Sequence, residues 1–174
     1  GTPEVVIGDF TLLKDADGKP ERGSVYKRYH VPESVAKWVQ TNIHPDIPND
    51  YRIGVQVFEH KWPGLTSTNA PHVDGPRGDF VLNYLLDTGG SAVATQWFKQ
   101  DGYPVLRIPE HQNGLYLMSF RGLTKIHEVV IPARTWHSLE IRAIHTIANL
   151  TSNRIALTIG CTSKIWAEVN ERYS

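Results

Sequence analysis

The sequence predicts a mainly β protein, a sandwich or barrel of short strands with a helix packed on its outside. From Tyr51 onward, short apolar runs follow one another, and clusters of glycine, proline, asparagine and aspartate separate many of them, as in Asp87-Thr88-Gly89-Gly90. Only one stretch, before these runs, has clear helical spacing. A doubly wound α/β fold would need helices that alternate regularly with the strands, so this class is excluded.

The predicted helix begins directly after Val31. Residues 32–34 are proline, glutamate and serine, which suit a first helical turn. Four apolar residues then recur at helical spacing and form one face: Val35, Trp38, Val39 and Ile43. Pro45 ends the helix, because proline cannot continue it. Before the helix, residues 1–30 are expected to form short extended pieces around a turn at 15–18.

Nine later segments have the composition and length of strands. They are 52–58, 79–86, 92–99, 105–108, 114–120, 126–131, 135–141, 144–148 and 154–162. Many short strands behind one or two helices near the N-terminus favour a packed β architecture with the helices outside it.

The length and composition indicate one domain. The chain has 174 residues, of which 40% are hydrophobic and 21% charged, and this is enough for one sizeable core. We find no repeat, low-complexity tract or composition break. We therefore expect a single domain over 1–174, in which residues 1–50 support a β core at 51–162 and residues 163–174 form a tail.

Charge and cysteine content restrict the partners and the compartment. Eighteen basic residues balance eighteen acidic ones, so there is no overall basic field to hold a nucleic acid. No apolar run approaches the roughly 18 residues of a membrane span, so no membrane partner is expected. The single cysteine, Cys161, excludes an internal disulfide, and the N-terminus lacks the pattern of a signal peptide. These features predict a cytoplasmic location.

The run Pro71-His72-Val73-Asp74-Gly75-Pro76 carries the sharpest chemical signal. In an extended segment, residues two apart point to the same side, so His72 and Asp74 can direct an imidazole and a carboxylate at one point. A histidine from another strand would complete a face of two histidines and one carboxylate, which leaves positions open on Fe(II). Alone, such a pair is more often a polar turn before a strand, and the later strands that carry histidine and arginine strengthen the metal interpretation.

Three histidines are candidates for the third ligand: His127, His137 and His145. We favour His145, because its short spacing to Arg154 lets two adjacent antiparallel strands present both residues. His137 and His127 remain open. A histidine that is not a ligand is expected to be hydrogen-bonded or to line a pocket.

Arg154 begins a strand with two different faces. With Ala156, Thr158 and Gly160 it forms a polar or small face, and the alternate residues are apolar. A buried arginine is costly unless it is paired. A dicarboxylate ligand would supply that pairing through a two-pronged contact.

Together, these residues resemble the Fe(II)/2-oxoglutarate-dependent dioxygenase superfamily, and residues 72–79 are similar to its prolyl-hydroxylase branch. The resemblance covers about residues 52–162. It implies a double-stranded β-helix, a jelly-roll and cupin-like architecture. It also implies Fe(II) bound by His72, Asp74 and His145, and 2-oxoglutarate as co-substrate with Arg154 on its distal carboxylate.

The same resemblance implies further contacts to 2-oxoglutarate. Thr158 lies four residues after Arg154, at a position that touches the co-substrate carboxylate in the prolyl-hydroxylase pattern. Tyr84 matches a tyrosine that contacts the co-substrate there, and Asn83 would serve instead under a one-residue shift. Two features depart from the pattern: residues 101–134 are longer than a minimal barrel needs, and Ala156 stands where some branches have serine.

The implied activity is hydroxylation of an unactivated C–H bond of a small molecule or a peptidyl side chain, with O2 as oxidant. Two other functions fit the same architecture. One is a cupin-like binding or sensor module that does not catalyse, which would leave the arginine and the metal set unexplained. The other is a cupin metalloenzyme that uses zinc or manganese without 2-oxoglutarate.

Overall fold

The fold consists of eleven strands and two helices in the part of the chain that the structure describes. The computed structural model describes residues 26–50, 52–60, 63–74, 80–102, 107–110, 115–118 and 120–174. The elements are β1 (Tyr26–Tyr29), α1 (Glu33–Asn42), β2 (Ile53–Phe58), β3 (His72–Val73), β4 (Phe80–Asp87), β5 (Ala94–Gln100), β6 (Arg107–Glu110), β7 (Leu115–Met118), β8 (Leu123–Val129), β9 (Trp136–Glu140), β10 (Ile144–Ala148), β11 (Arg154–Cys161) and α2 (Ser163–Tyr173).

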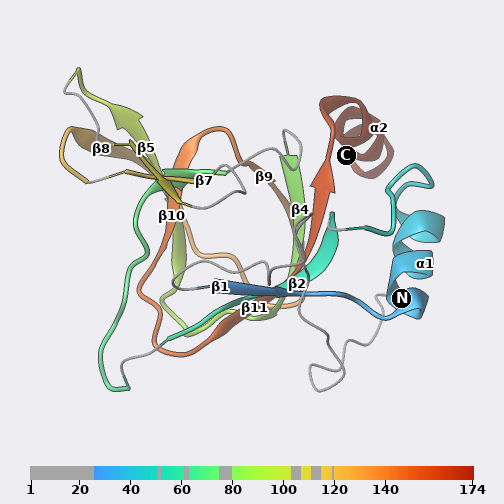
Figure 1. Cartoon of the computed structure of the whole chain (residues 1–174), viewed down its shortest axis with the longest axis horizontal. Coiled ribbons are helices and arrows are strands. Elements are labelled where there is room, and N and C mark those ends of the chain that lie inside the picture. The colour runs from blue at the N-terminus through green and yellow to red at the C-terminus, as the bar shows by residue number, and fades with distance from the viewer. Residues whose placement is uncertain are drawn as a thin grey trace.

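The strands form two antiparallel sheets (Figure 1). One sheet has five strands in the order β1-β2-β11-β4-β9, and the other has six in the order β6-β7-β3-β10-β5-β8. Of the first four strands after α1, β2 and β4 lie in the first sheet, whereas β3 and β5 lie in the second. From β8 to β11 the chain again alternates between the sheets, so neighbours in space are often far apart in sequence.

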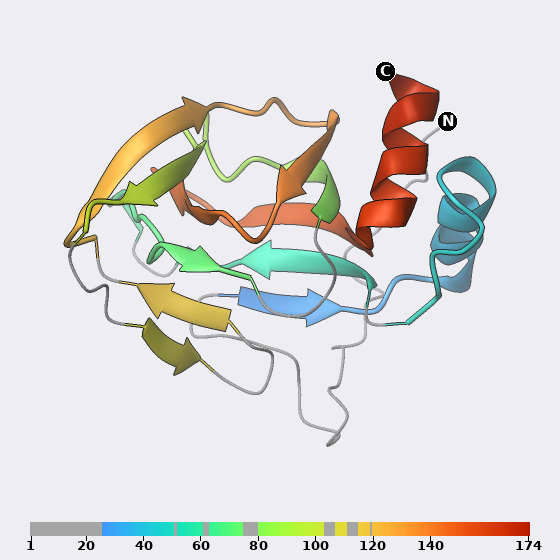
Figure 2. The same ribbon diagram turned by 90° about the horizontal axis from the view of Figure 1, so that it is seen from above.

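Both helices lie on the same side of the molecule, beside the five-stranded sheet (Figure 2). Helix α1 buries Val35 and Val39, which pack with Val55 of β2 and Leu157 of β11. We call this cluster the helix-side core. At its N-terminus, α2 is capped by Thr162, whose hydroxyl accepts a hydrogen bond from the amide of Ile165 at 3.3 Å.

The opposite face of the five-stranded sheet points toward the second sheet. On β11, Leu157 belongs to the helix-side core, whereas Ala156 packs with Leu85 in a separate cluster, as the alternation of a strand requires. Phe58 at the end of β2 packs against a cluster that contains Ile147 of β10. Since β2 and β10 belong to different sheets, this contact packs the two sheets against each other.

The expected helix is confirmed and runs from Glu33 to Asn42, and all nine expected strands have counterparts. Residues 163–173 form α2, a helix at the C-terminal end, where a tail was expected. The turn expected at 15–18 lies outside the described residues. Neither helix of the described part is long and apolar enough to cross a membrane.

Candidate metal centre

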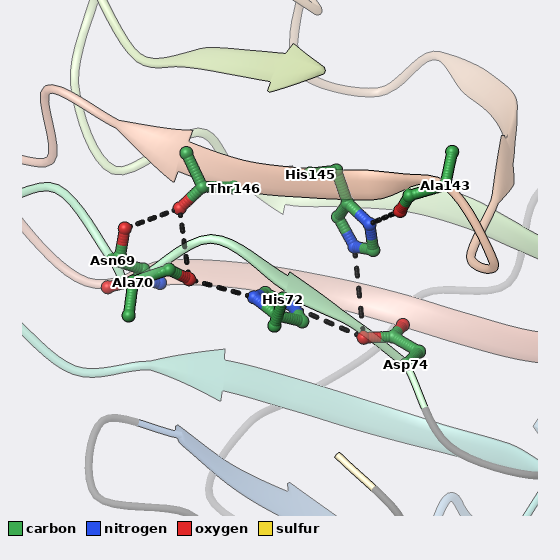
Figure 3. A network of polar contacts seen from close by, with 7 residues as sticks. All are labelled: Asn69, Ala70, His72, Asp74, Ala143, His145 and Thr146. Carbon is green, nitrogen blue, oxygen red and sulfur yellow. Dashed lines mark hydrogen bonds and ion pairs between the residues drawn. The ribbon is translucent and has the colours of Figure 1, made fainter. Parts of the chain in front are cut away.

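Three side chains that are distant in sequence meet at the junction of β3 and β10. His72 and His145 are direct partners across these two antiparallel strands, and their ring centroids lie 4.6 Å apart. Asp74 follows β3, where its backbone amide donates to the carbonyl of Ile141 at 2.9 Å. The three side chains point toward one another (Figure 3), and one ligand atom from each lies within 4.8 Å of the others.

Hydrogen bonds to the backbone fix which nitrogen of each histidine faces this centre. Nδ1 of His72 lies 2.9 Å from the carbonyl oxygen of Ala70, and Nδ1 of His145 lies 2.8 Å from that of Ala143. A carbonyl oxygen can only accept, so each Nδ1 carries the proton and donates. In the neutral form of each imidazole, Nε2 then directs a lone pair at Asp74, which is the arrangement that metal-ligating histidines adopt.

The distances fit a single metal ion. Oδ1 of Asp74 lies 3.1 Å from Nε2 of His72 and 3.7 Å from Nε2 of His145. Two ligand atoms at about 2.1 Å from one ion and at right angles to each other are about 3.0 Å apart. Two lone pairs that face a carboxylate at this range repel it unless a positive charge lies between them. The donor set therefore suits a divalent cation that takes imidazole and carboxylate ligands.

Burial favours the neutral form of His145. Its side chain is almost fully buried, and this burial lowers the pKa of the imidazole, with a smaller contribution from His72. The Asp74 carboxylate and the Ala143 carbonyl oppose the shift. A neutral imidazole is the form that binds metal, so the environment of His145 favours ligation.

The other two histidine candidates lie elsewhere. His127 is exposed on β8, where its ring contacts Trp97 at a centroid distance of 5.4 Å. His137 is partly buried on β9, and burial together with the charge of Arg154 lowers its pKa. Neither residue belongs to the group formed by His72, Asp74 and His145.

Arg154 is buried at the start of β11, with 4% of its surface exposed. Its Nη1 donates to the carbonyl of Thr88 at 3.4 Å, a long hydrogen bond. Burial lowers the pKa of the guanidinium to about 10. Among the residues that the structure describes, no carboxylate pairs with Arg154. A buried guanidinium without a carboxylate partner needs an anion, as expected from the sequence.

Gly89 lies against the turn that precedes Arg154, and this close approach explains why position 89 is a glycine. Gly89 has φ +80°, and a Cβ at this position would lie 2.7 Å from Cδ2 of Leu150 and 3.1 Å from Cβ of Arg154. A larger residue would therefore be strained and would clash. The close approach places the Thr88 carbonyl next to the guanidinium of Arg154.

Thr158 has a different neighbourhood from the one expected. Its hydroxyl donates to the carbonyl of Gly54 at 3.2 Å and accepts from Nη2 of Arg28 at 3.1 Å. The proton of the Thr158 hydroxyl is therefore donated to a backbone carbonyl. Sequence reasoning missed Arg28, which is only 1% exposed. Lys27 and Arg28 are adjacent cations on a short strand, and nothing in the sequence indicates which of them is buried.

The two alternatives Asn83 and Tyr84 lie on opposite faces of β4. Tyr84 packs in the helix-side core, with its ring 5.1 Å from that of Trp136. It therefore points away from the space between the sheets, which removes it from the candidate contacts of a ligand there. Asn83 lies in register between Thr158 and His137, and its buried Oδ1 has no hydrogen-bond partner among the residues that the structure describes.

Comparisons with known proteins leave the family open. No family model matches the chain, and no curated protein matches it. Among solved structures, it is similar to a cupin superfamily protein from Desulfitobacterium hafniense DCB-2, with 11% identity over 88% of this chain and 98% of that chain, at a TM-score of 0.36. A match this distant defines neither the family nor the function of the chain.

Proposed function

We propose that this protein is an Fe(II)- and 2-oxoglutarate-dependent oxygenase that hydroxylates an unactivated C–H bond of a small molecule or a peptidyl side chain. The observation that carries the proposal is the convergence of His72, Asp74 and His145, with both Nε2 atoms directed at the carboxylate. This donor set is the one that non-haem Fe(II) oxygenases use.

His72, Asp74 and His145 would hold the iron on one face and leave its other positions open. The carbonyls of Ala70 and Ala143 keep both imidazoles in the required tautomer. Asp74 supplies the negative charge that partly neutralises a divalent ion. Bound iron with 2-oxoglutarate would supply the activation of O2 that this reaction needs.

Arg154 would bind the distal carboxylate of 2-oxoglutarate. The guanidinium is buried, it carries a charge at neutral pH, and no carboxylate pairs with it within the described part of the chain. Asn83 is the second candidate contact. Rotation of its side-chain amide about χ2 would direct Nδ2 at a carboxylate in place of the unpartnered Oδ1. Thr158 would then position Arg28 through its hydroxyl.

The strand order supports a jelly-roll, or double-stranded β-helix, for the core. Eight strands would belong to it: β2, β3, β4, β5, β8, β9, β10 and β11. Numbered from one to eight in this sequence, they have the order 1-8-3-6 in one sheet and 2-7-4-5 in the other, which is the arrangement of two packed Greek keys. In this arrangement His72, Asp74 and His145 come from the second sheet and Arg154 from the first.

The substrate would be a small molecule or a short peptide, and the balanced charge gives no reason to expect a nucleic acid or a membrane. The buried surroundings of His145 and Arg154 would keep water away from the reacting groups. A reducing environment maintains Fe(II), so the protein would act in the cytoplasm, the location expected from the single cysteine.

The test is an anaerobic titration of the metal-free protein with Fe(II) and then with 2-oxoglutarate. We expect a visible charge-transfer absorption that needs both ligands, and release of succinate when oxygen is admitted with a substrate. Arg154→Gln should weaken 2-oxoglutarate binding and leave iron binding unchanged. The control is His127→Ala, an exposed site that should change neither.

Iron binding without any effect of 2-oxoglutarate would overturn the co-substrate assignment. It would favour a cupin metalloenzyme of another kind. Failure to bind any divalent metal would leave only a binding module and would contradict the whole proposal.

A further inference from the structure

A pocket lies outside the candidate metal centre, where both helices meet the outer face of the five-stranded sheet. It has a volume of about 490 Å³ and is lined by residues of α1, α2, β4 and β9. This size falls in the range of small-molecule sites. The residues that form the metal centre take no part in it, so the pocket is separate from the proposed function.

Three tryptophans form the walls of this helix-side pocket: Trp38 of α1, Trp136 of β9 and Trp166 of α2. The rings of Trp38 and Trp136 are nearly parallel, with an interplanar angle of 7° and centroids 6.2 Å apart. Trp166 stacks on Phe80 at 4.3 Å. All three remain partly exposed although each has a ring partner, so flat aromatic faces are held in place beside an open space.

Hydrogen bonds between the α1 region and α2 hold the pocket in shape. Nη1 of Arg172 donates to the carbonyl of Ile43 at 3.0 Å, and Nε2 of His44 lies 2.6 Å from a carboxylate oxygen of Glu168. The hydroxyl of Tyr173 also donates to the carbonyl of Asn42. These contacts join the C-terminal end of α1 and the turn after it to α2. They fix the two helices relative to each other.

The polar groups of the lining are uncharged. Asparagine, serine, tyrosine and histidine contribute, and no aspartate, glutamate, lysine or arginine does. Ser138 and Asn170 are exposed, and their side chains make no hydrogen bond to the described part of the chain. The lining itself therefore offers no charged side chain to a charged ligand, and the nearby Arg172 and Glu168 are engaged in contacts between the helices. A neutral ligand with hydroxyl groups would find both donors and acceptors.

We propose that the helix-side pocket binds an uncharged sugar ring. A pyranose has an apolar face of C–H groups, which packs on an aromatic face, and a rim of hydroxyls, which matches Ser138 and Asn170. Nδ2 of Asn42, also in the lining, already donates to the carbonyl of Trp38 at 2.9 Å. A flat aromatic ligand would use the walls and leave the rim without partners. Ser138 and Asn170 are exposed, so the outer hydroxyls of such a ligand would stay in water.

The experiment uses the full metal-free chain, so its outcome does not depend on iron or on 2-oxoglutarate. Methyl glucoside, methyl galactoside and methyl mannoside are titrated in turn, with indole and glucuronate as comparison probes. Tryptophan fluorescence and saturation-transfer NMR report binding. We expect at least one neutral glycoside to shift the emission and to show saturation of its C–H protons, and glucuronate to bind much more weakly.

The matched variants are Ser138→Ala with Asn170→Ala, compared with Ser91→Ala and Asn49→Ala at exposed sites outside the pocket. Loss of two hydrogen bonds should raise the Kd for the glycoside about tenfold in the first pair, and the second pair should bind like the unmodified protein. An unchanged Kd in the first pair, binding of indole alone, equal binding of glucuronate, or no binding of any glycoside would each overturn the proposal.

Discussion

Replacing Arg154 with methionine is expected to stabilise the protein while it abolishes binding of 2-oxoglutarate. The guanidinium is 4% exposed, and burial lowers its pKa to about 10. The ordinary pKa of arginine lies above 12, and each unit of difference between folded and unfolded states corresponds to about 1.4 kcal/mol. The buried charge therefore destabilises the unliganded protein by about 3 kcal/mol.

The expected gain is smaller than this figure because the substitution also removes a hydrogen bond. Methionine has a similar length and no charge, but it cannot donate to the carbonyl of Thr88, a loss of about 1 kcal/mol. The net gain is about 2 kcal/mol at neutral pH, within the range observed when buried charges are replaced by apolar residues. For a chain of this size, that corresponds to a rise in Tm of about 4–8 °C.

The assay is chemical denaturation of both proteins at neutral pH and at pH values above 10, with 2-oxoglutarate binding measured by calorimetry in the presence of Mn(II). Above pH 10 the folded protein begins to lose the Arg154 proton while the unfolded chain keeps it. The unmodified protein therefore gains stability relative to the variant as the pH rises. The difference between their free energies of unfolding becomes smaller. Arg142 is exposed, and the control variant Arg142→Met should change neither the stability nor the binding of 2-oxoglutarate. A variant that is less stable at neutral pH, or that still binds 2-oxoglutarate, would refute this reasoning.

Three further predictions test other parts of the structure. His145→Ala should lower divalent metal affinity by more than about 100-fold in calorimetry, beyond the effect of residues that only support a ligand, whereas His137→Ala should bind metal normally; the reverse result would reassign the third ligand. The Cys161 thiol is buried and its pKa is raised to about 12, so a thiol reagent should modify it only after unfolding, and rapid labelling of the folded protein would contradict the placement of β11. Leu157→Ala should destabilise the protein by about 2–5 kcal/mol in urea, because it opens a cavity in the helix-side core, whereas the exposed Leu65→Ala should change stability by less than about 0.5 kcal/mol; equal effects would mean that Leu157 is not a core residue.

Local sequence patterns predicted the strands and the first helix because each pattern has its own period. The two-residue period of a strand also predicted that His72 and Asp74 share a side, and in the structure both face the same point. His145 could be preferred over the other histidines because its short distance to Arg154 suits adjacent antiparallel strands. In the structure these two strands lie in different sheets, so this geometric argument was wrong. The structure nevertheless brings His145, and neither of the other two candidates, together with His72 and Asp74.

Other features depend on contacts that a pattern does not reveal. A one-residue shift exchanges the two faces of a strand, so only packing could decide between Asn83 and Tyr84. The helix-side core accepts the aromatic ring of Tyr84, and Asn83 takes the other face. The burial of Arg28 arises in the same way, from the pairing of β1 with β2 next to Thr158.

The second helix was missed although a local signal was present. Thr162 is a favourable N-cap, and Ile165, Trp166 and Val169 follow at helical spacing. The segment is short and mostly polar, however, and isolated helices of this length are marginal in water. It gains its stability from packing of these apolar residues on the helix-side core.

The most direct test of the metal centre is anomalous diffraction from crystals grown anaerobically with Fe(II). We expect a single iron peak bonded to Nε2 of His72, Oδ1 of Asp74 and Nε2 of His145. Iron bound through His137 or His127, or no iron between these three side chains, would contradict the account.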